Sequence, residues 1–531
     1  MATRIFLRAL LLTVIGLSSG CASLPPGSDF QKTATVALAH PDLTPLGRKY
    51  DALARAHNDH SGFRIIPVGA DGFLIRMQMI NAATRTLDLQ YFIFHQDNTG
   101  RLLTDAVLRA ADRGVRVRVL IDDGEMRAED ARVLALAAHP LIQIRIFNPF
   151  SYRGHNPLLR SLDFITDAER LDYRMHNKLL VVDNTLALVG GRNIGDRYFQ
   201  IDPDSQVADD DVFVAGPLTR QLSNTFDDYW NSDMAIPVAA LSRENTSSAA
   251  LIAFRSELEL HNSQLKADGF NYVKRLASGQ PFDGIMSGTL PLIWAHGEVV
   301  CDSPDKKEVE EGKMGGSLMQ RPVEEAVQGV HSELLMITPY LIPGKDGMQI
   351  FNTLHQRHVR VRVLTNSLSS TPVLVAQAGF MHYEIPMLEA GVELYEIRSL
   401  LGNTRGSGET RAISRYGNYS LHAKLYVFDR QKVFIGSMNF DQRSLHLNTE
   451  IGLIIDSPVL AQQIAHRFNE MVQPVNAYQL ILQTDNTGTP RLLWRTREDG
   501  KTIEYTTEPA RNEWQRLKAG AFSLLPLDNE L

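Results

Sequence analysis

One pattern that occurs twice constrains this chain more than any other feature of its sequence. Residues 176–193 and 422–439 share the same spacing: a histidine, a lysine two residues later, an aspartate, a Gly-Gly or Gly-Ser pair and an asparagine. The second copy follows the first by 246 positions (422 − 176). Internal repeats are the sequence signature of duplicated structural units. The chain is therefore predicted to contain two similar lobes.

The local structure of each copy can be predicted from its residue order. In the first copy Leu-Leu-Val-Val separates Lys178 from Asp183, and Asn-Thr and Leu-Ala-Leu-Val follow the aspartate. This order predicts a β-hairpin with a buried strand and a turn at the aspartate. Because strand side chains alternate between faces, His176 and Lys178 should point the same way. Asp183 has the opposite parity, which favours a role at the turn.

Two such hairpins facing each other would gather imidazoles, ammonium groups and amides around one pocket. The glycine pair would let the backbone approach closely, and the asparagine would add an amide donor. Such a pocket suits a phosphate diester, whose oxygens carry negative charge. The candidate catalytic residues are His176, Lys178 and Asp183, with His422, Lys424 and Asp429 in the second copy. The candidate substrate-binding residues are Gly191, Asn193, Ser437 and Asn439.

The alternative is that these histidines are ordinary core residues whose ring nitrogens are hydrogen-bonded. That alternative predicts an isolated histidine. Here two histidines occupy the same position of the repeated pattern, and each precedes a lysine by two residues. One imidazole could attack phosphorus to form a phosphohistidine while the other protonates the leaving oxygen. The remaining histidines and the two cysteines show no zinc-ligand spacing. We therefore predict no metal site and no cofactor.

The rest of the chain repeats along with the motif. Residues 113–122 and 357–366 match almost letter for letter, and Tyr340 precedes its histidine nearly as Tyr91 precedes the first one. Helical patterns between strand patterns predict α/β lobes. Tyr91, Asp122, Tyr340 and Asn366 fall where strand ends should meet the pocket.

Each catalytic histidine needs an acceptor that orients its far ring nitrogen. Aligning Ser457-Pro458 with Gly216-Pro217 places Glu450 opposite Asp209. We predict that Asp209 and Glu450 are the orienting carboxylates. Asp211, which shares a strand face with Asp209, is the alternative.

The doubled motif, with residues 190–199 and 439–450 around it, resembles the phospholipase D superfamily, and within it the bacterial cardiolipin synthase branch of the C type. The resemblance covers the chain from about Arg55 to Leu531. It implies two tandem lobes related by a pseudo-twofold axis. It also implies a phosphatidyltransferase that makes cardiolipin from phosphatidylglycerol and a second phospholipid, with phosphatidylethanolamine as a candidate.

Three other functions stay open at this stage. A hydrolytic phospholipase D would use the same residues and release phosphatidic acid. A nuclease of the superfamily is disfavoured by the net charge of −7 and pI of about 6.2. A non-enzymatic, membrane-tethered lipid-binding protein is disfavoured because both motifs are complete.

The N-terminus has the layout of a secretory signal. Arg4 and Arg8 precede a short apolar run, Ala9–Leu17, and a small residue then precedes Cys21. This order resembles a bacterial lipoprotein cleavage site, so Cys21 is predicted to be acylated, and a plain secretory signal is the alternative. By family habit, the protein would be a periplasm-facing lipoprotein, more often on the inner face of the outer membrane than on the inner membrane.

The predicted organisation has six parts. They are a signal or lipoprotein peptide (1–21), a tether (22–54), the first lobe (55–240), a polar inter-lobe connection with one helix (241–320), the second lobe (321–480) and a C-terminal tail packed on the lobes (481–531).

Overall fold

The computed structural model describes most of the chain after the predicted signal. The described residues are 25–126, 130–154, 156–201, 206–241, 247–268, 281–401, 419–484 and 487–525. The predicted lipidation site, Cys21, lies outside them.

The first lobe is a twisted mixed sheet covered by helices. Its strands lie side by side in the order β1, β8, β6, β5, β2, β3, β4, β9. The strands are β1 (Ser61–Ile66), β2 (Thr86–Tyr91), β3 (Arg116–Asp122), β4 (Ile142–Phe147), β5 (Leu179–Val182), β6 (Leu186–Gly190), β8 (Asp211–Ala215) and β9 (Ala235–Pro237). The main helices are α3 (Gly69–Ala82), α4 (Asn98–Asp112), α5 (Asp130–Ala137) and α8 (Leu218–Asn231).

The second lobe repeats this order strand for strand. Its sequence across the sheet is β10, β17, β16, β15, β11, β12, β13, β18. The strands are β10 (Ile293–Cys301), β11 (Glu333–Ile337), β12 (Arg360–Asn366), β13 (Glu393–Ile397), β15 (Leu425–Phe428), β16 (Lys432–Gly436), β17 (Ile451–Asp456) and β18 (Ala477–Thr484). Its helices include α14 (Gln320–Gln328), α15 (Gly344–Gln356), α16 (Leu374–Phe380), α17 (Glu384–Glu389) and α19 (Pro458–Met471). The predicted pair of α/β lobes is confirmed.

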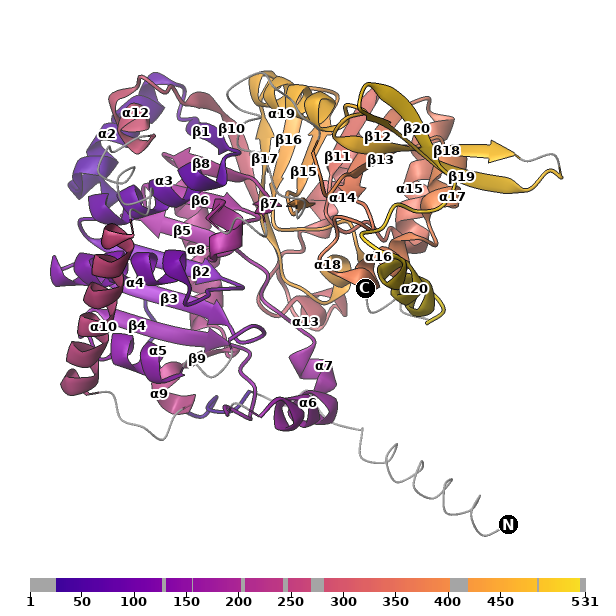
Figure 1. Ribbon diagram of the computed structural model, residues 1–531. Helices are drawn as coiled ribbons and strands as arrows, with labels where there is room; N and C mark the ends of the chain where they lie inside the picture. Colours follow the sequence, from indigo (N-terminus) through magenta and orange to yellow (C-terminus); the bar gives the residue numbers. More distant parts are fainter. Residues whose placement is uncertain are drawn as a thin grey trace, which may run out of the picture.

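Strand β10 joins the two lobes into one sheet. Its first residues pair with β1, with Ala295 opposite Ser61, and its later residues pair with β17, with His296 opposite Asp456. The sheet has 18 strands among the described residues, and Figure 1 shows β10 and β17 where the lobes meet. The inter-lobe connection was expected to hold one helix, and α10 (Ser248–Ala267) is that helix. The strand was not expected.

One apolar core also crosses the boundary between the lobes. Buried side chains of α8, including Leu222 and Phe226, belong to the same cluster as Leu460 and Phe468 of α19. The burial of contiguous apolar surface is the main force that holds such layers together. The lobes are therefore fixed against each other by both sheet and core.

The N-terminal segment differs from the prediction of a tether over residues 22–54. Arg145 and Arg118 of the first sheet donate to the carbonyl oxygens of Thr33 (2.8 Å) and Thr35 (2.9 Å). The chain then forms η1 (Pro41–Leu43) and α2 (Pro45–Ala56), and the Thr44 side chain caps α2. From about Thr33 onward this segment is thus a structural part of the first lobe.

The C-terminal tail packs on the second lobe, as predicted. Strands β19 (Pro490–Glu498) and β20 (Lys501–Tyr505) extend the sheet beyond β18, and α20 (Glu513–Phe522) follows. Arg511 Nε and Gln515 Nε2 donate to the carbonyl oxygens of Ser369 (2.6 Å) and Leu368 (2.7 Å).

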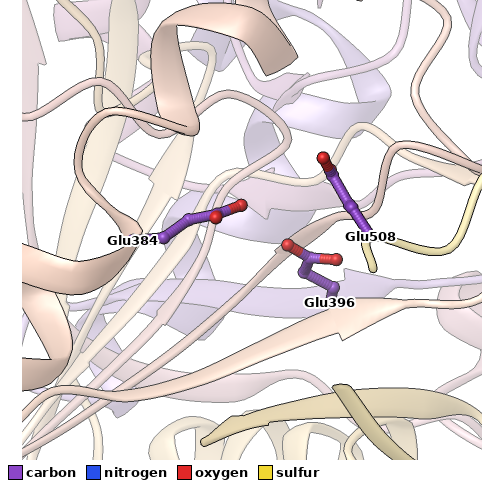
Figure 2. Close-up of side chains that lie close together, drawn as sticks. All are labelled: Glu384, Glu396 and Glu508. Carbon is purple, nitrogen blue, oxygen red and sulfur yellow. The ribbon is translucent and has the colours of Figure 1, made fainter. Parts of the chain in front are cut away.

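Three buried glutamates meet where this tail crosses the second lobe (Figure 2). They are Glu384 at the start of α17, Glu396 on β13 and Glu508 after β20, and one carboxylate oxygen of each lies within 4.8 Å of the other two. Both oxygens of Glu396 are buried without a hydrogen-bond partner in the described residues. Burial, followed by the charges of the neighbouring glutamates, raises the pKa of Glu396 well above its usual value. Burial also raises the pKa of Glu508, to about 7.

These shifts predict that stability falls as the pH rises. A carboxyl group whose folded pKa is raised stabilises the fold below its unfolded pKa of about 4.3, and that contribution is lost as pH rises through the folded value. The midpoint of thermal unfolding should therefore fall between pH 5 and pH 8. Glu396→Gln, which keeps the shape without the charge, should flatten this dependence. The exposed Glu259→Gln should not.

Thermal denaturation of the three proteins across this pH range checks the prediction. An unchanged pH slope in Glu396→Gln would contradict it. Stabilisation of the wild type at pH 8 by millimolar calcium or magnesium would show instead that a cation neutralises the three glutamates.

Candidate active site

The two repeated motifs form matching hairpins. Strands β5 and β6 are joined at Asp183 and Asn184, whose φ angles are 50° and 49°, and β15 and β16 are joined at Asp429 and Arg430, at 50° and 56°. Positive φ at two successive residues is typical of a type I′ turn, and a third residue, Thr185 or Gln431, completes each connection. The predicted hairpins with turns at the aspartates are therefore present in both lobes.

The two motif aspartates serve these turns. Asp183 accepts hydrogen bonds from the backbone N–H groups of residues 84–86, and Asp429 accepts from those of residues 331–333. Each carboxylate thus fixes the turn to the loop that enters the neighbouring strand, β2 or β11. These contacts favour the structural role of Asp183 and Asp429 over the catalytic role assigned to them from the motif.

Short parallel strand pairs between the lobes carry the other motif residues. Strand β7 (Gln206–Ala208) pairs with β14 (Tyr419–Leu421), so that Ala208 lies opposite Leu421 and the next residues are Asp209 and His422. On the other side Met175 pairs with Thr449, and the next residues are His176 and Glu450. Each pairing therefore brings a histidine of one lobe beside a carboxylate of the other.

Each histidine bonds to the carboxylate that this pairing supplies. His176 Nδ1 lies 2.9 Å from Glu450 Oε2, and His422 Nδ1 lies 2.6 Å from Asp209 Oδ2. Asp209 and Glu450 are the two residues predicted to orient the histidines, and here each acts on the opposite lobe. The alternative, Asp211, instead forms buried ion pairs with Arg76 and Arg192.

The Gly-Gly and Gly-Ser pairs accommodate these carboxylates. A Cβ atom on Gly191 would lie 2.2 Å from Asp209 Oδ1, so this position has no room for a side chain. In the second lobe the Ser437 hydroxyl donates to Glu450 Oε2 at 2.5 Å, and the Ser444 hydroxyl donates to Oε1 at 2.9 Å. Gly191 and Ser437 were predicted to contact substrate, and in the structure they contact the orienting carboxylates.

The two asparagines differ in their surroundings. Asn193 is engaged on both sides, because its Oδ1 accepts from Ile93 N (3.1 Å) and its Nδ2 donates to the Tyr198 hydroxyl (3.1 Å). Asn439 Oδ1 is buried without a hydrogen-bond partner in the part of the chain that the structure describes. The second-lobe amide is therefore the freer of the two.

His176 is buried, His422 is nearly buried, and basic groups surround both. Burial lowers the pKa of His176 well below its usual value, and the charges of Lys178 and Lys424 lower it further. The same holds for His422, with Lys424 and then Lys178 as the next causes. Because the lysine of the other lobe also lowers the pKa of each imidazole, the two motifs form one electrostatic centre. The neutral form of both imidazoles is favoured.

The pKa values of the two lysines and of the two orienting carboxylates are shifted as well. Burial lowers the pKa of Lys424 to about 8 and that of Lys178 well below its usual value. Burial also raises the pKa of Asp209 and of Glu450 to about 7. Burial thus disfavours the charged form of each basic group, and a bound anion such as a phosphate diester would favour it again.

Matched residues at strand ends hold the backbone before each histidine. Asp122, at the end of β3, accepts from Met175 N at 2.9 Å, and Asn366, at the end of β12, accepts from Leu421 N at 2.8 Å. Their predicted place beside the pocket agrees with these contacts. Tyr91 lies deeper, where Arg76 Nε donates to its hydroxyl at 3.2 Å.

Sequence reasoning missed one support of the site. Asp302 Oδ2 accepts from Glu450 N (3.0 Å), and Lys306 Nζ donates to Asp302 Oδ2 (3.1 Å) and to the Asn448 carbonyl (2.9 Å). Both residues follow β10 in the inter-lobe connection. They lie outside the repeated segments, so no repeated pattern could reveal them.

Comparison with known proteins agrees with this duplicated architecture. The family described as "Cardiolipin synthase, PLD-like domain" matches residues 77–230 and 324–472. The chain is 38% identical over 482 residues to cardiolipin synthase C of Escherichia coli strain K12, a match that covers 90% of this chain and 97% of the relative. It is 24% identical over 395 residues to cardiolipin synthase A of Proteus mirabilis strain HI4320, with 73% and 64% covered.

A solved structure shares the fold. The phosphatidylserine synthase of Haemophilus influenzae Rd KW20 superposes with a TM-score of 0.52 at 13% identity, over 81% of this chain and 92% of the other. At this identity the likeness concerns the fold alone.

The reciprocal pairs predict matched effects of isosteric substitutions. Asp209→Asn and Glu450→Gln should each lower kcat for phosphodiester turnover by about 10²- to 10⁴-fold, because the amide favours the wrong imidazole tautomer. The unfolding midpoint should change little. Asp211→Asn is the control, because it leaves Arg76 and Arg192 without a buried counter-charge and should act mainly on stability. Steady-state kinetics with thermal unfolding separates these effects, and full kcat in either dyad variant would contradict the assignment.

Proposed function

This chain belongs to the cardiolipin synthase branch of the phospholipase D superfamily, and from that premise we propose that it is a phosphatidyltransferase that forms cardiolipin. The observation that carries the proposal is the pair of histidines, each hydrogen-bonded to a carboxylate of the opposite lobe. Two imidazoles in one cationic centre can divide the work of nucleophile and acid on a phosphodiester.

In the first half of the cycle, Nε2 of neutral His176 attacks the phosphorus of the donor phospholipid. An N–P bond forms and the bond from phosphorus to the headgroup oxygen breaks. His422, as an imidazolium that Asp209 and the bound anionic diester stabilise, gives its Nε2 proton to the departing alcohol. Lys178 and Lys424 offset the negative charge on the phosphoryl oxygens. His176 is our choice of nucleophile by analogy with families of this superfamily.

In the second half, a hydroxyl of phosphatidylglycerol resolves the intermediate. His422, now neutral, takes the hydroxyl proton, the hydroxyl oxygen bonds to phosphorus and the N–P bond breaks. Both histidines return to their starting states, and cardiolipin leaves. We propose phosphatidylglycerol as acceptor and phosphatidylethanolamine as one donor, which would release ethanolamine.

Water is the competing acceptor, and hydrolysis would yield phosphatidic acid. Burial favours transfer, because only 7% of the surface of His176 is exposed and both orienting carboxylates are fully buried. Positioning of a bound alcohol can be worth an effective molarity on the order of 10⁵ M or more, which exceeds the concentration of water. Phospholipase D hydrolysis is therefore the alternative outcome of the same chemistry.

We also propose that the enzyme is a lipoprotein anchored through Cys21 and facing the periplasm. Among the described residues, no helix has both the length and the apolar character needed to cross a bilayer. The sequence of the signal-like segment supports the anchor.

Cys21→Ser should abolish incorporation of radiolabelled palmitate and change the mobility of the precursor. Absence of label from the wild-type protein would contradict the anchor.

The proposed cycle predicts that both histidines are required. His176→Ala and His422→Ala should each lower cardiolipin formation by at least about 10³-fold, since each plays a separate part in the same turnover. His466→Ala, an exposed histidine on α19, is the matched control and should keep full activity. Chelators should leave turnover unchanged.

Mass spectrometry of the products formed in mixed micelles is the measurement. With labelled phosphatidylglycerol, tested with and without phosphatidylethanolamine, cardiolipin should dominate over phosphatidic acid. Phosphatidic acid as the main product would replace the synthase with a hydrolase. Substantial activity in either alanine variant would refute the two-histidine cycle.

A further inference from the structure

Helix α6 (Pro157–Thr166) of the first lobe presents apolar side chains to solvent. None of its residues is buried. Leu158, Leu162 and Ile165 are 77%, 55% and 71% exposed, and their spacing of four and three residues places them on one face of the helix. Leu159 adds to that face, with 44% exposed. We call these four side chains the apolar stripe.

The two charged side chains of α6, Arg160 and Asp163, contact the protein instead. Arg160 Nη2 donates to the Asp123 carbonyl at 2.6 Å, and its guanidinium lies 3.7 Å from the centroid of the Phe150 ring. Asp163 accepts from Tyr152 N at 2.9 Å. The amphipathic helices of globular proteins turn their apolar face to the core. In α6 this orientation is reversed, and the hydrogen bonds of Arg160 and Asp163 fix the helix in that orientation.

The position of α6 connects it with the catalytic centre. The chain passes from α6 through α7 (Ala168–Leu171) to His176. Arg443 of the second lobe donates to Asp172 at 2.7 Å, and the Tyr173 hydroxyl donates to the Pro304 carbonyl at 2.8 Å. Helices α6 and α7 therefore lie beside the junction of the two lobes. Figure 1 shows α6 at the lower edge of the molecule, below α7.

The N-terminal segment enters the first lobe at the same end. A Cβ atom on Gly27 would contact Ile236 and Ala240, in β9 and α9 (Val238–Leu241). Met234, just before β9, accepts from the backbone N–H of Asn148, and residues 148–156 lead directly into α6. Cys21, the proposed lipid anchor, precedes the described chain by only a few residues. An anchor at Cys21 and the apolar stripe would thus meet the same surface.

We propose that α6 is an interfacial helix, which inserts its apolar stripe into the acyl region of a phospholipid bilayer and holds the catalytic centre near the lipid surface. The proposal rests on the proposed function, in which both substrates are membrane lipids. A helix in the interface plane binds through buried apolar area. The two charged side chains of α6 are engaged with protein, so the insertion should be insensitive to salt.

The direct test places an environment-sensitive fluorophore on the stripe. Leu162→Cys is labelled in the full-length protein, where the only other cysteine besides Cys21 is the buried Cys301. Leu260→Cys on α10 is the matched control, because Leu260 is similarly exposed, at 61%, and Figure 1 shows α10 at the far left edge of the first lobe, away from α6. Vesicles of phosphatidylcholine and phosphatidylglycerol are then added, with and without a quencher attached to the acyl chains.

The label at position 162 should shift to shorter wavelength and be quenched in the vesicles, at low and at high salt, whereas the label at position 260 should do neither. A label at 162 that stays in water would overturn the proposal. A shift that needs no vesicles and grows with protein concentration would also overturn it, because a second copy of the chain would then cover the stripe.

A second measurement uses turnover. The triple variant Leu158→Glu, Leu162→Glu, Ile165→Glu should lose cardiolipin formation on vesicles and keep the wild-type unfolding midpoint. The control pair Ile252→Glu and Leu260→Glu should lose neither. The fluorescence signal needs no catalysis, so insertion without activity would refute the proposed function alone, and activity without insertion would refute this proposal alone.

Discussion

The active centre depends on two hydrogen bonds, each of which joins a histidine of one lobe to a carboxylate of the other lobe. His176 is oriented by Glu450 and His422 by Asp209, so neither lobe holds a complete catalytic pair. The parallel pairings of β7 with β14 and of Met175 with Thr449 set these contacts through the backbone. The shared strand β10 and the apolar core common to both lobes hold that register. Docking of the lobes is therefore a condition of chemistry, since catalytic groups act only when held within a fraction of an ångström.

Charge in the centre explains why a phosphodiester suits it. Burial lowers the pKa of both lysines, because an ammonium group loses its hydration there. A bound phosphate returns a counter-charge and favours the charged form of each lysine again. The same burial favours the neutral form of His176, as a nucleophile requires, whereas a bound anion and Asp209 together favour the charged form of His422, as an acid requires. Binding of an anionic substrate and protonation of the lysines thus favour each other. An uncharged ester would not favour the charged form of the lysines in this way.

Much of the fold was predictable from the sequence because it is local or duplicated. The hairpins follow from alternating apolar residues with a turn at Asp183 and Asp429, and the shared order of strands follows from the repeat. Asp209 and Glu450 could be found by aligning the two copies. Their exchange between lobes could not, because pairing across more than 200 residues leaves no local pattern. Strand β10 was missed because His296, Gly297 and Glu298 interrupt its apolar run. Lys306 was missed because the residues that follow it, 307–311, are mostly charged, as is typical of a solvent-exposed segment.

The central claim is that His176 and His422 act as nucleophile and acid in one centre, and it is tested most directly by trapping the covalent intermediate. His422 acts in both the formation and the resolution of this intermediate, so the wild-type enzyme is the protein to trap. It would be incubated with phosphatidylglycerol labelled in its acyl chains, quenched during the first turnovers in alkali, where phosphohistidine survives, and mapped by peptide mass spectrometry. The account predicts one phosphatidyl adduct, on the peptide that contains His176, and none in His176→Ala. An adduct on another residue, or its absence while cardiolipin is being formed, would contradict it.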